Sequence, residues 1–112
     1  MSPKRGEIWL VNLNPTRGHE QSGIRPAVVI SVDEFNSCAA DLVVVIPITS
    51  KNKNIPLHVQ IPPGSSGLDK LSFAKPEDIR SIAKERLIKQ IGQIPKEKLQ
   101  ELEEKVKTLL GL

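Results

Sequence analysis

Short apolar runs separated by turn-forming residues fill this chain up to residue 94, and they constrain its fold more than any other feature. The runs are rich in Val and Ile and are bounded by Gly, Pro, Asn and Asp, which is typical of β-strands. Many short strands at close spacing favour a small barrel or sandwich. The runs predict strands at 7–13, 24–32, 42–48, 57–61, 72–74, 78–82 and 87–91.

Alternation within two of these runs predicts which side chains face inward. In the first run, Ile8 and Leu10 alternate with Trp9 and Val11, so the two pairs are expected on opposite faces of the strand. The run 57–61 also alternates, with Leu57, Val59 and Ile61 inward. Between strands, Asp33 is expected to cap a single helical turn at 33–37.

The hydrophobic period changes after Pro95, which suits the first turn of a helix. Leu99, Leu102 and Val106 then recur at helical spacing, and Gly111 is a typical helix stop. A single helix packed on the strands would bury this apolar stripe. We therefore expect a mainly β fold with α (α+β), in which a C-terminal helix covers a small sheet.

Length and composition limit what else the chain can be. Its 112 residues allow one hydrophobic core, so we expect a single domain, 1–112. The only cysteine, Cys38, has no internal partner, and no apolar run approaches the ~20 residues of a membrane span. Residues 1–6 lack the apolar stretch of a signal peptide. These features predict a cytoplasmic protein without a membrane partner.

A polar loop bounded by Gly18 and Gly23 leads through Arg25 and Pro26 into an apolar strand. Pro26 biases the backbone of Arg25 toward extended geometry, so the guanidinium is expected to be exposed yet fixed in place. The strand at 42–48 ends in two hydroxyl residues, Thr49 and Ser50. Strand ends of this kind are good positions for functional side chains.

The inventory of reactive residues favours chemistry on phosphate. We find no cluster of His and Cys with zinc spacing, no phosphate-binding glycine motif and no nucleophile elbow, so neither a metal nor a cofactor is expected. Arginine stays charged at neutral pH, and its planar fork matches a phosphoryl group. RNA supplies its own nucleophile, the 2′-hydroxyl, so a guanidinium beside a hydroxyl is a minimal site for its cleavage. The same pair is also common as a surface hydrogen bond.

Four stretches, in family order and spacing, resemble the MazF/PemK (Kid-like) toxin family: 5–9 (RGEIW), 18–30 (GHEQSGIRPAVVI), 45–50 (VIPITS) and 78–82 (DIRSI). The resemblance covers essentially the whole chain. It implies an SH3-like barrel assembled as a homodimer. It also implies the toxin of a type II toxin-antitoxin system, which cleaves single-stranded RNA at short sequences without the ribosome or a metal and is neutralised by a cognate antitoxin.

Carried over residue by residue, the resemblance implies that Arg25 and Thr49 are the catalytic pair and that the products carry 2′,3′-cyclic phosphate and 5′-hydroxyl ends. Arg25 would stabilise charge at the phosphorus, and Thr49 would hydrogen-bond the scissile phosphate. Further substrate contacts are expected at Glu20, Gln21, Ser22, Asn36, Ser50, Lys51, Lys53, Asp78 and Arg80.

Several of these assignments have alternatives. Glu20 and Gln21 would either contact RNA or simply be solvated residues of the loop. Arg80 would either meet a phosphate or pair with Glu77 or Asp78. Asp78 itself departs from the family pattern, because many relatives carry glutamine before the Ile-Arg pair, and an acid near RNA would alter base preference.

The antitoxin is expected to wrap the RNA groove of the dimer with a disordered, acidic and apolar tail.

Two other functions remain open at this point. A non-enzymatic gyrase poison of the CcdB type would share the fold, but such proteins act through C-terminal residues unlike the 110–112 stretch (LGL) of this chain. An inactive relative that only binds RNA would be consistent with the acid at Asp78.

Overall fold

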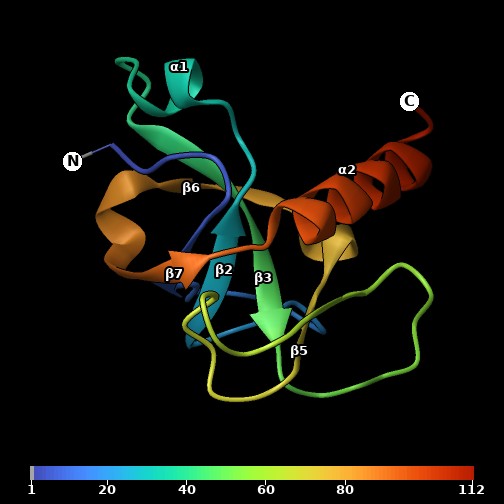
Figure 1. Ribbon diagram of the computed structural model, residues 1–112. Coiled ribbons are helices and arrows are strands. Elements are labelled where there is room, and N and C mark those ends of the chain that lie inside the picture. The colour runs from blue at the N-terminus through green and yellow to red at the C-terminus, as the bar shows by residue number, and fades with distance from the viewer. Residues whose placement is uncertain (1) are drawn as a thin grey trace.

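The computed structural model describes residues 2–112, which form one strongly curled antiparallel sheet with a long C-terminal helix packed against it (Figure 1). This confirms the expected mainly β fold with a C-terminal helix. None of the helices among these residues is long and apolar enough to cross a membrane. The strands are β1 (Glu7–Asn12), β2 (Ile24–Val29), β3 (Leu42–Thr49), β4 (Val59–Ile61), β5 (Ser72–Ala74), β6 (Arg80–Ala83) and β7 (Leu87–Gln93). The helices are α1 (Asp33–Asn36) and α2 (Lys96–Leu110), with short 3₁₀ turns η1 (Pro76–Asp78) and η2 (Lys84–Arg86).

Strand β3 is the centre of the sheet because it is hydrogen-bonded along both edges. The strand order is β4-β5-β3-β2-β1-β7, and β6 also pairs with β3. One edge of β3 pairs with β2. Along its other edge, residues 42–45 pair with β6, and residues 48–49 pair with β5. The sheet therefore changes neighbour partway along its central strand, where η1 connects β5 to β6.

Alternation along the strands builds two hydrophobic clusters. On β1, Ile8 belongs to one cluster, whereas Trp9 and Val11 belong to the other, as the alternating pattern predicts. Leu13, which directly follows the strand, joins the second cluster. Both clusters contain β-branched residues of β2 and β3. Helix α2 completes the first cluster, in which Leu102 is 0% exposed. The sheet thus buries both faces of its central strands, which explains their nearly continuous apolar sequence.

Several predicted boundaries shift. Strand β2 ends at Val29 and does not reach residue 32. Strand β4 begins at Val59, because residues 56–57 form a turn that leaves Leu57 half-buried. The run 78–82 divides into the end of η1 and strand β6, which begins at Arg80.

Two helix starts also differ from expectation. Asp33 does not cap α1, because the cap residue is Val32 and the carboxylate of Asp33 accepts a hydrogen bond from the backbone N–H of Arg5. Pro95 is the N-cap of α2, and the first helical residue is Lys96. Gly111 ends the helix in the left-handed conformation, as predicted.

The packing of α2 predicts a position-dependent loss of stability along one helix. We expect Leu102→Ala to lower the free energy of unfolding by about 3 kcal/mol, because it leaves a cavity in the first cluster. Leu110→Ala, on the same helix but 54% exposed, should change it by less than about 0.5 kcal/mol. Urea unfolding followed by circular dichroism measures both, and equal losses would contradict this account of the core.

Candidate active site

A cleft of about 500 Å³ brings Arg25 and Thr49 together. Strand register builds its floor: Leu10 of β1 lies opposite Pro26 of β2 on one side and Lys89 of β7 on the other, and all three line the cleft. Arg25 and Thr49 therefore reach a common space from two neighbouring strands.

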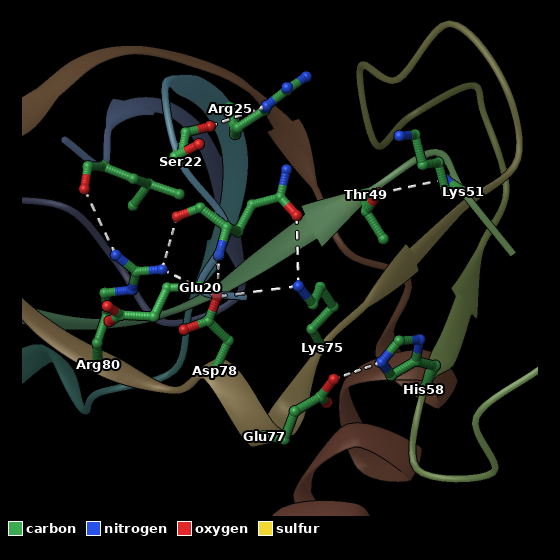
Figure 2. Close-up of polar contacts among 12 residues, drawn as sticks. Glu20, Ser22, Arg25, Thr49, Lys51, His58, Lys75, Glu77, Asp78 and Arg80 are labelled. Atoms are coloured by element: carbon green, nitrogen blue, oxygen red, sulfur yellow. Dashed lines mark hydrogen bonds and ion pairs between the residues drawn. The ribbon is translucent and has the colours of Figure 1, made fainter. Parts of the chain in front are cut away.

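Arg25 presents a guanidinium that is held at one end and open at the other. Its Nε donates a hydrogen bond of 3.1 Å to the backbone carbonyl of Ser22, and its side chain points away from that loop (Figure 2). Among residues 2–112, none of the ion pairs involves Arg25. Since the hydrogen bond to Ser22 uses only Nε, the two terminal nitrogens of the guanidinium remain available to bind an anion.

Thr49 ends β3 with its hydroxyl oriented by the following residues. The residue is 8% exposed, and Oγ1 accepts a hydrogen bond of 3.2 Å from the backbone N–H of Lys51. A hydroxyl has one proton to donate. Since the bond to Lys51 uses an acceptor position of the oxygen, the proton remains available to an acceptor in the cleft.

Residues 67–70 also line the cleft, and the loop 62–71 that contains them is packed closely against β7. A Cβ atom on Gly67 would lie 1.9 Å from the carbonyl oxygen of Ile91, and one on Gly92 would lie 2.3 Å from backbone atoms of Ser66. The Ser66 hydroxyl is buried and donates to the carbonyl of Pro62 at 2.7 Å. This close approach of two backbones fixes the loop beside the catalytic candidates.

The cleft has an excess of positive charge. Arg25, Lys70 and Lys89 line it, against one acidic residue, Asp69. This balance suits a polyanion. Sequence reasoning missed Lys70, Lys89 and Asp69, because their place in the cleft follows from loop packing and from the register of β7. The only local signal was that they are charged residues next to apolar ones.

Three predicted substrate residues line a second cleft, of about 420 Å³. These are Glu20, Lys53 and Asp78. His19 and Glu77 line it as well, as does Lys75, which sequence reasoning also missed. Lys75 follows β5 directly and, like Arg25, immediately precedes a proline.

The predicted residues Gln21, Asp78 and Arg80 contact one another, and Gln21 also contacts Lys75. Figure 2 shows Lys75, Asp78 and Arg80 grouped together. Arg80 pairs with Asp78 at 2.9 Å, which is one of the two roles that the sequence left open for it. Its side chain is 17% exposed and that of Asp78 is 11% exposed. Both charges are therefore largely engaged within the protein.

The remaining predicted contacts divide between exposed and buried positions. Ser50 lines the first cleft, while Ser22 and Lys51 are exposed next to Arg25 and Thr49 respectively. Asn36 is different, because it is 0% exposed and its amide is hydrogen-bonded to Ser31 at the start of α1. The structure gives Asn36 a role in fixing that turn, and a fully buried side chain cannot contact a substrate.

Within residues 2–112, no group of three or more His, Cys, Asp or Glu side chains is arranged to hold a metal ion. The chemistry that the first cleft offers on its own side chains is the binding and neutralisation of an anion by a guanidinium, with a hydroxyl donor beside it.

Comparison with known families gives this arrangement a context. The family described as PemK-like, MazF-like toxin of type II toxin-antitoxin system matches residues 4–110. The chain belongs to this family. The resemblance drawn from the four sequence stretches is thereby confirmed.

Characterised relatives of this MazF-family chain are similar over nearly their whole length. It is 41% identical to Endoribonuclease MazF9 of Mycobacterium tuberculosis over 114 residues, which cover 97% of each chain. It is 36% identical to Endoribonuclease MazF of Staphylococcus saprophyticus over 110 residues, covering 97% of this chain and 92% of the relative.

Solved structures of the family have the same fold. The crystal structure of MazF from Deinococcus radiodurans matches with a TM-score of 0.89 at 31% identity, covering 100% of this chain and 99% of that one. A MazE-MazF crystal structure from the same organism matches with a TM-score of 0.80 at 26% identity, covering 100% and 98%. The expected small barrel of the MazF/PemK type is therefore confirmed.

The close approach at Gly67 predicts that the wall of the first cleft depends on this glycine. We expect Gly67→Ala to destabilise the protein by about 1–3 kcal/mol more than Gly111→Ala, because only Gly67 adds a backbone clash to the cost of a positive φ. The two glycines have φ of +77° and +73°, and an added Cβ meets nothing within 4 Å at Gly111. Urea unfolding measures the free energy of unfolding of both variants. Equal losses would contradict the prediction, because they would mean that the loop 62–71 can move away from β7 without loss of stability.

Proposed function

We propose that this chain, as a single toxin domain spanning residues 1–112, is a metal-independent endoribonuclease in which Arg25 and Thr49 act on the scissile phosphate of single-stranded RNA. The observation that carries the proposal is the shared cleft, which is lined by a hydroxyl donor and by a guanidinium that forms no ion pair among residues 2–112. Membership of the MazF-like toxin family and two relatives named as endoribonucleases support it.

The proposed reaction needs no external reagent. The 2′-oxygen of the target nucleotide forms a bond to phosphorus while the bond from phosphorus to the 5′-oxygen breaks, leaving a 2′,3′-cyclic phosphate and a 5′-hydroxyl. The 2′-hydroxyl loses a proton and the 5′-oxygen gains one. Negative charge grows on the phosphoryl oxygens in between, and the two terminal nitrogens of Arg25 are suited to stabilise it. The Thr49 hydroxyl would donate to the same group and hold the phosphate in line for attack.

Charges around the two clefts suit the rest of an RNA strand. Lys70 and Lys89 extend the positive charge of Arg25 along the first cleft, which favours neighbouring phosphates. The second cleft contains carboxylates at Glu20 and Glu77, which can accept hydrogen bonds from base amino groups. We infer that the first cleft binds backbone and the second reads bases, with Ser22, Ser50, Lys51 and Lys53 as lesser contacts.

We further infer two protein partners. The MazE-MazF structure of Deinococcus radiodurans supports binding of a cognate antitoxin by this chain, since that toxin has the same fold. A second copy of the chain is the other proposed partner, with the RNA groove running across the dimer. Ile24 and Ile88 are 61% and 48% exposed, respectively, and exposed apolar side chains of this size are suited to an interface.

Arg25→Ala is expected to lower kcat for cleavage of single-stranded RNA by at least about 100-fold, because it removes the main charge that stabilises the transition state. Thr49→Ala should lower it by about 10- to 100-fold and Thr49→Ser should restore most of the loss, because serine keeps the hydroxyl. Gel-based cleavage of a fluorescent RNA in EDTA measures all three variants.

Lys107→Gln is the matched control for these variants, since it removes a positive charge from the last turn of α2 and should leave cleavage unchanged. An RNA with a 2′-deoxy nucleotide at the cleavage position should remain intact. Cleavage of that RNA, or full activity of Arg25→Ala, would reject the proposed mechanism.

The proposed homodimer predicts a sedimentation-equilibrium mass of twice the 12.4 kDa chain. Ile24→Glu should shift the protein toward the monomer, because it places a charge in the apolar contact. Leu112→Glu, at a residue that is 85% exposed near the end of α2, is the control. A wild-type protein that sediments as a monomer at micromolar concentration would exclude the shared groove.

A further inference from the structure

Asp78 lines the second cleft, but its Oδ2 atom faces groups of the protein itself. Its Oδ2 accepts hydrogen bonds from the backbone N–H of Gln21 at 2.8 Å and from Arg80 Nη2 at 2.9 Å. The same oxygen lies 4.0 Å from Nζ of Lys75 (Figure 2). One carboxylate oxygen therefore faces two cations and the loop that carries Gln21.

Three polar groups of Gln21 are hydrogen-bonded to residues 75–80. Its N–H donates to Asp78, its carbonyl accepts from Arg80 Nη2 at 2.8 Å, and its side-chain oxygen accepts from Lys75 Nζ at 3.3 Å. The next residue in the chain is Ser22, whose carbonyl accepts the bond from Arg25 Nε. A continuous path of bonds thus runs from Asp78 through two loop residues to the guanidinium.

The loop 16–23 needs such an anchor. Gly18 and Gly23 adopt positive φ values of +60° and +80°, and an added Cβ would meet nothing within 4 Å at either. Gly23 is hydrogen-bonded to Leu13 and Asn14 at the end of the loop, so the middle of the loop needs a separate anchor. Glycines of this kind permit many backbone conformations. The bonds to Gln21 hold the middle of the loop to β6 and η1, and thus select one of those conformations.

We propose that Asp78 is a positioning residue that holds the loop 16–23 in place through its hydrogen bond with Gln21. The fixed loop in turn orients Arg25 through the Ser22 carbonyl. This proposal rests on the proposed catalytic role of Arg25. It is an alternative to the sequence-based expectation that Asp78 contacts RNA.

The charges explain why an acid suits this position. The side chains of Lys75 and Arg80 are only 5% and 17% exposed. Two largely buried cations side by side repel each other and are poorly hydrated, so a carboxylate between them stabilises both. With Asp78 present, Arg80 can donate from Nη2 to the Gln21 carbonyl while Asp78 accepts from the Gln21 N–H. Both backbone polar groups of Gln21 are then hydrogen-bonded.

The test compares Asp78→Ala with Asp78→Asn, because asparagine keeps an oxygen that can accept from the Gln21 N–H. For Asp78→Ala we expect kcat on RNA to fall about tenfold or more, with KM changing much less. Hydrogen exchange of the peptide containing 16–23 in the free protein should accelerate by a similar factor. Asp78→Asn should recover part of both losses, and it decides the question if Asp78→Ala does not fold.

Glu103→Gln is the matched control, since it breaks another carboxylate–arginine pair, between Arg5 and Glu103, outside both clefts. It should change neither kcat nor exchange in the loop. A changed set of cleaved RNA sequences in Asp78→Asn, with unchanged kcat and loop exchange, would mean that Asp78 contacts a base and would overturn the proposal. Full activity of both Asp78→Asn and Asp78→Ala would also overturn the proposal. If Arg25→Ala is inactive in the same assay, the proposed function still stands. An active Arg25→Ala would instead reject the proposed function.

Discussion

Hydrogen bonding along both edges of β3 is the constraint on which the rest of the structure depends. The strand contains Pro47, which has no N–H to donate, and the carbonyl of Pro47 accepts from the backbone N–H of Lys75. In an antiparallel strand the N and O of one residue face the same edge. The missing donor therefore faces the place where β3 changes partner, from β6 up to Val45 to β5 from Ile48. The break in pairing leaves space for η1, which carries Asp78.

The sequence was sufficient to predict the elements whose buried side chains follow a regular hydrophobic period. Trp9 and Ile8 lie in opposite clusters, as alternation predicts, and Leu102 is central to the contact of α2 with the sheet. The predicted ends of strands and helices were wrong where contacts with residues distant in sequence override the local sequence pattern. Asp33 is a good cap residue by type, but its carboxylate accepts instead from Arg5, a residue distant in sequence. Such choices between partners leave no mark on the local sequence.

The candidate site divides in the same way. Arg25 could be singled out because a proline follows it and a strand begins there, and the structure places it in one cleft with Thr49. Their catalytic role stays a prediction. Asn36 was assigned to substrate by type and position, but it is fully buried and its amide is hydrogen-bonded to Ser31. Asp78 has partners within the protein and also lines the second cleft, so its contact with substrate stays a prediction. Lys89 was missed because its place beside the cleft depends on pairing between β1 and β7, which sequence pattern does not specify.

The loop 62–71 divides into a tightly packed part and an exposed part. Ser66 and Leu68 are buried and Gly67 allows no side chain, so these positions hold the loop to β7. Asp69 and Lys70 follow directly, are exposed and line the cleft. Mutations at these two positions can therefore change the charge of the cleft without disturbing the core. The electrostatics of this surface can thus be altered independently of the stability of the fold.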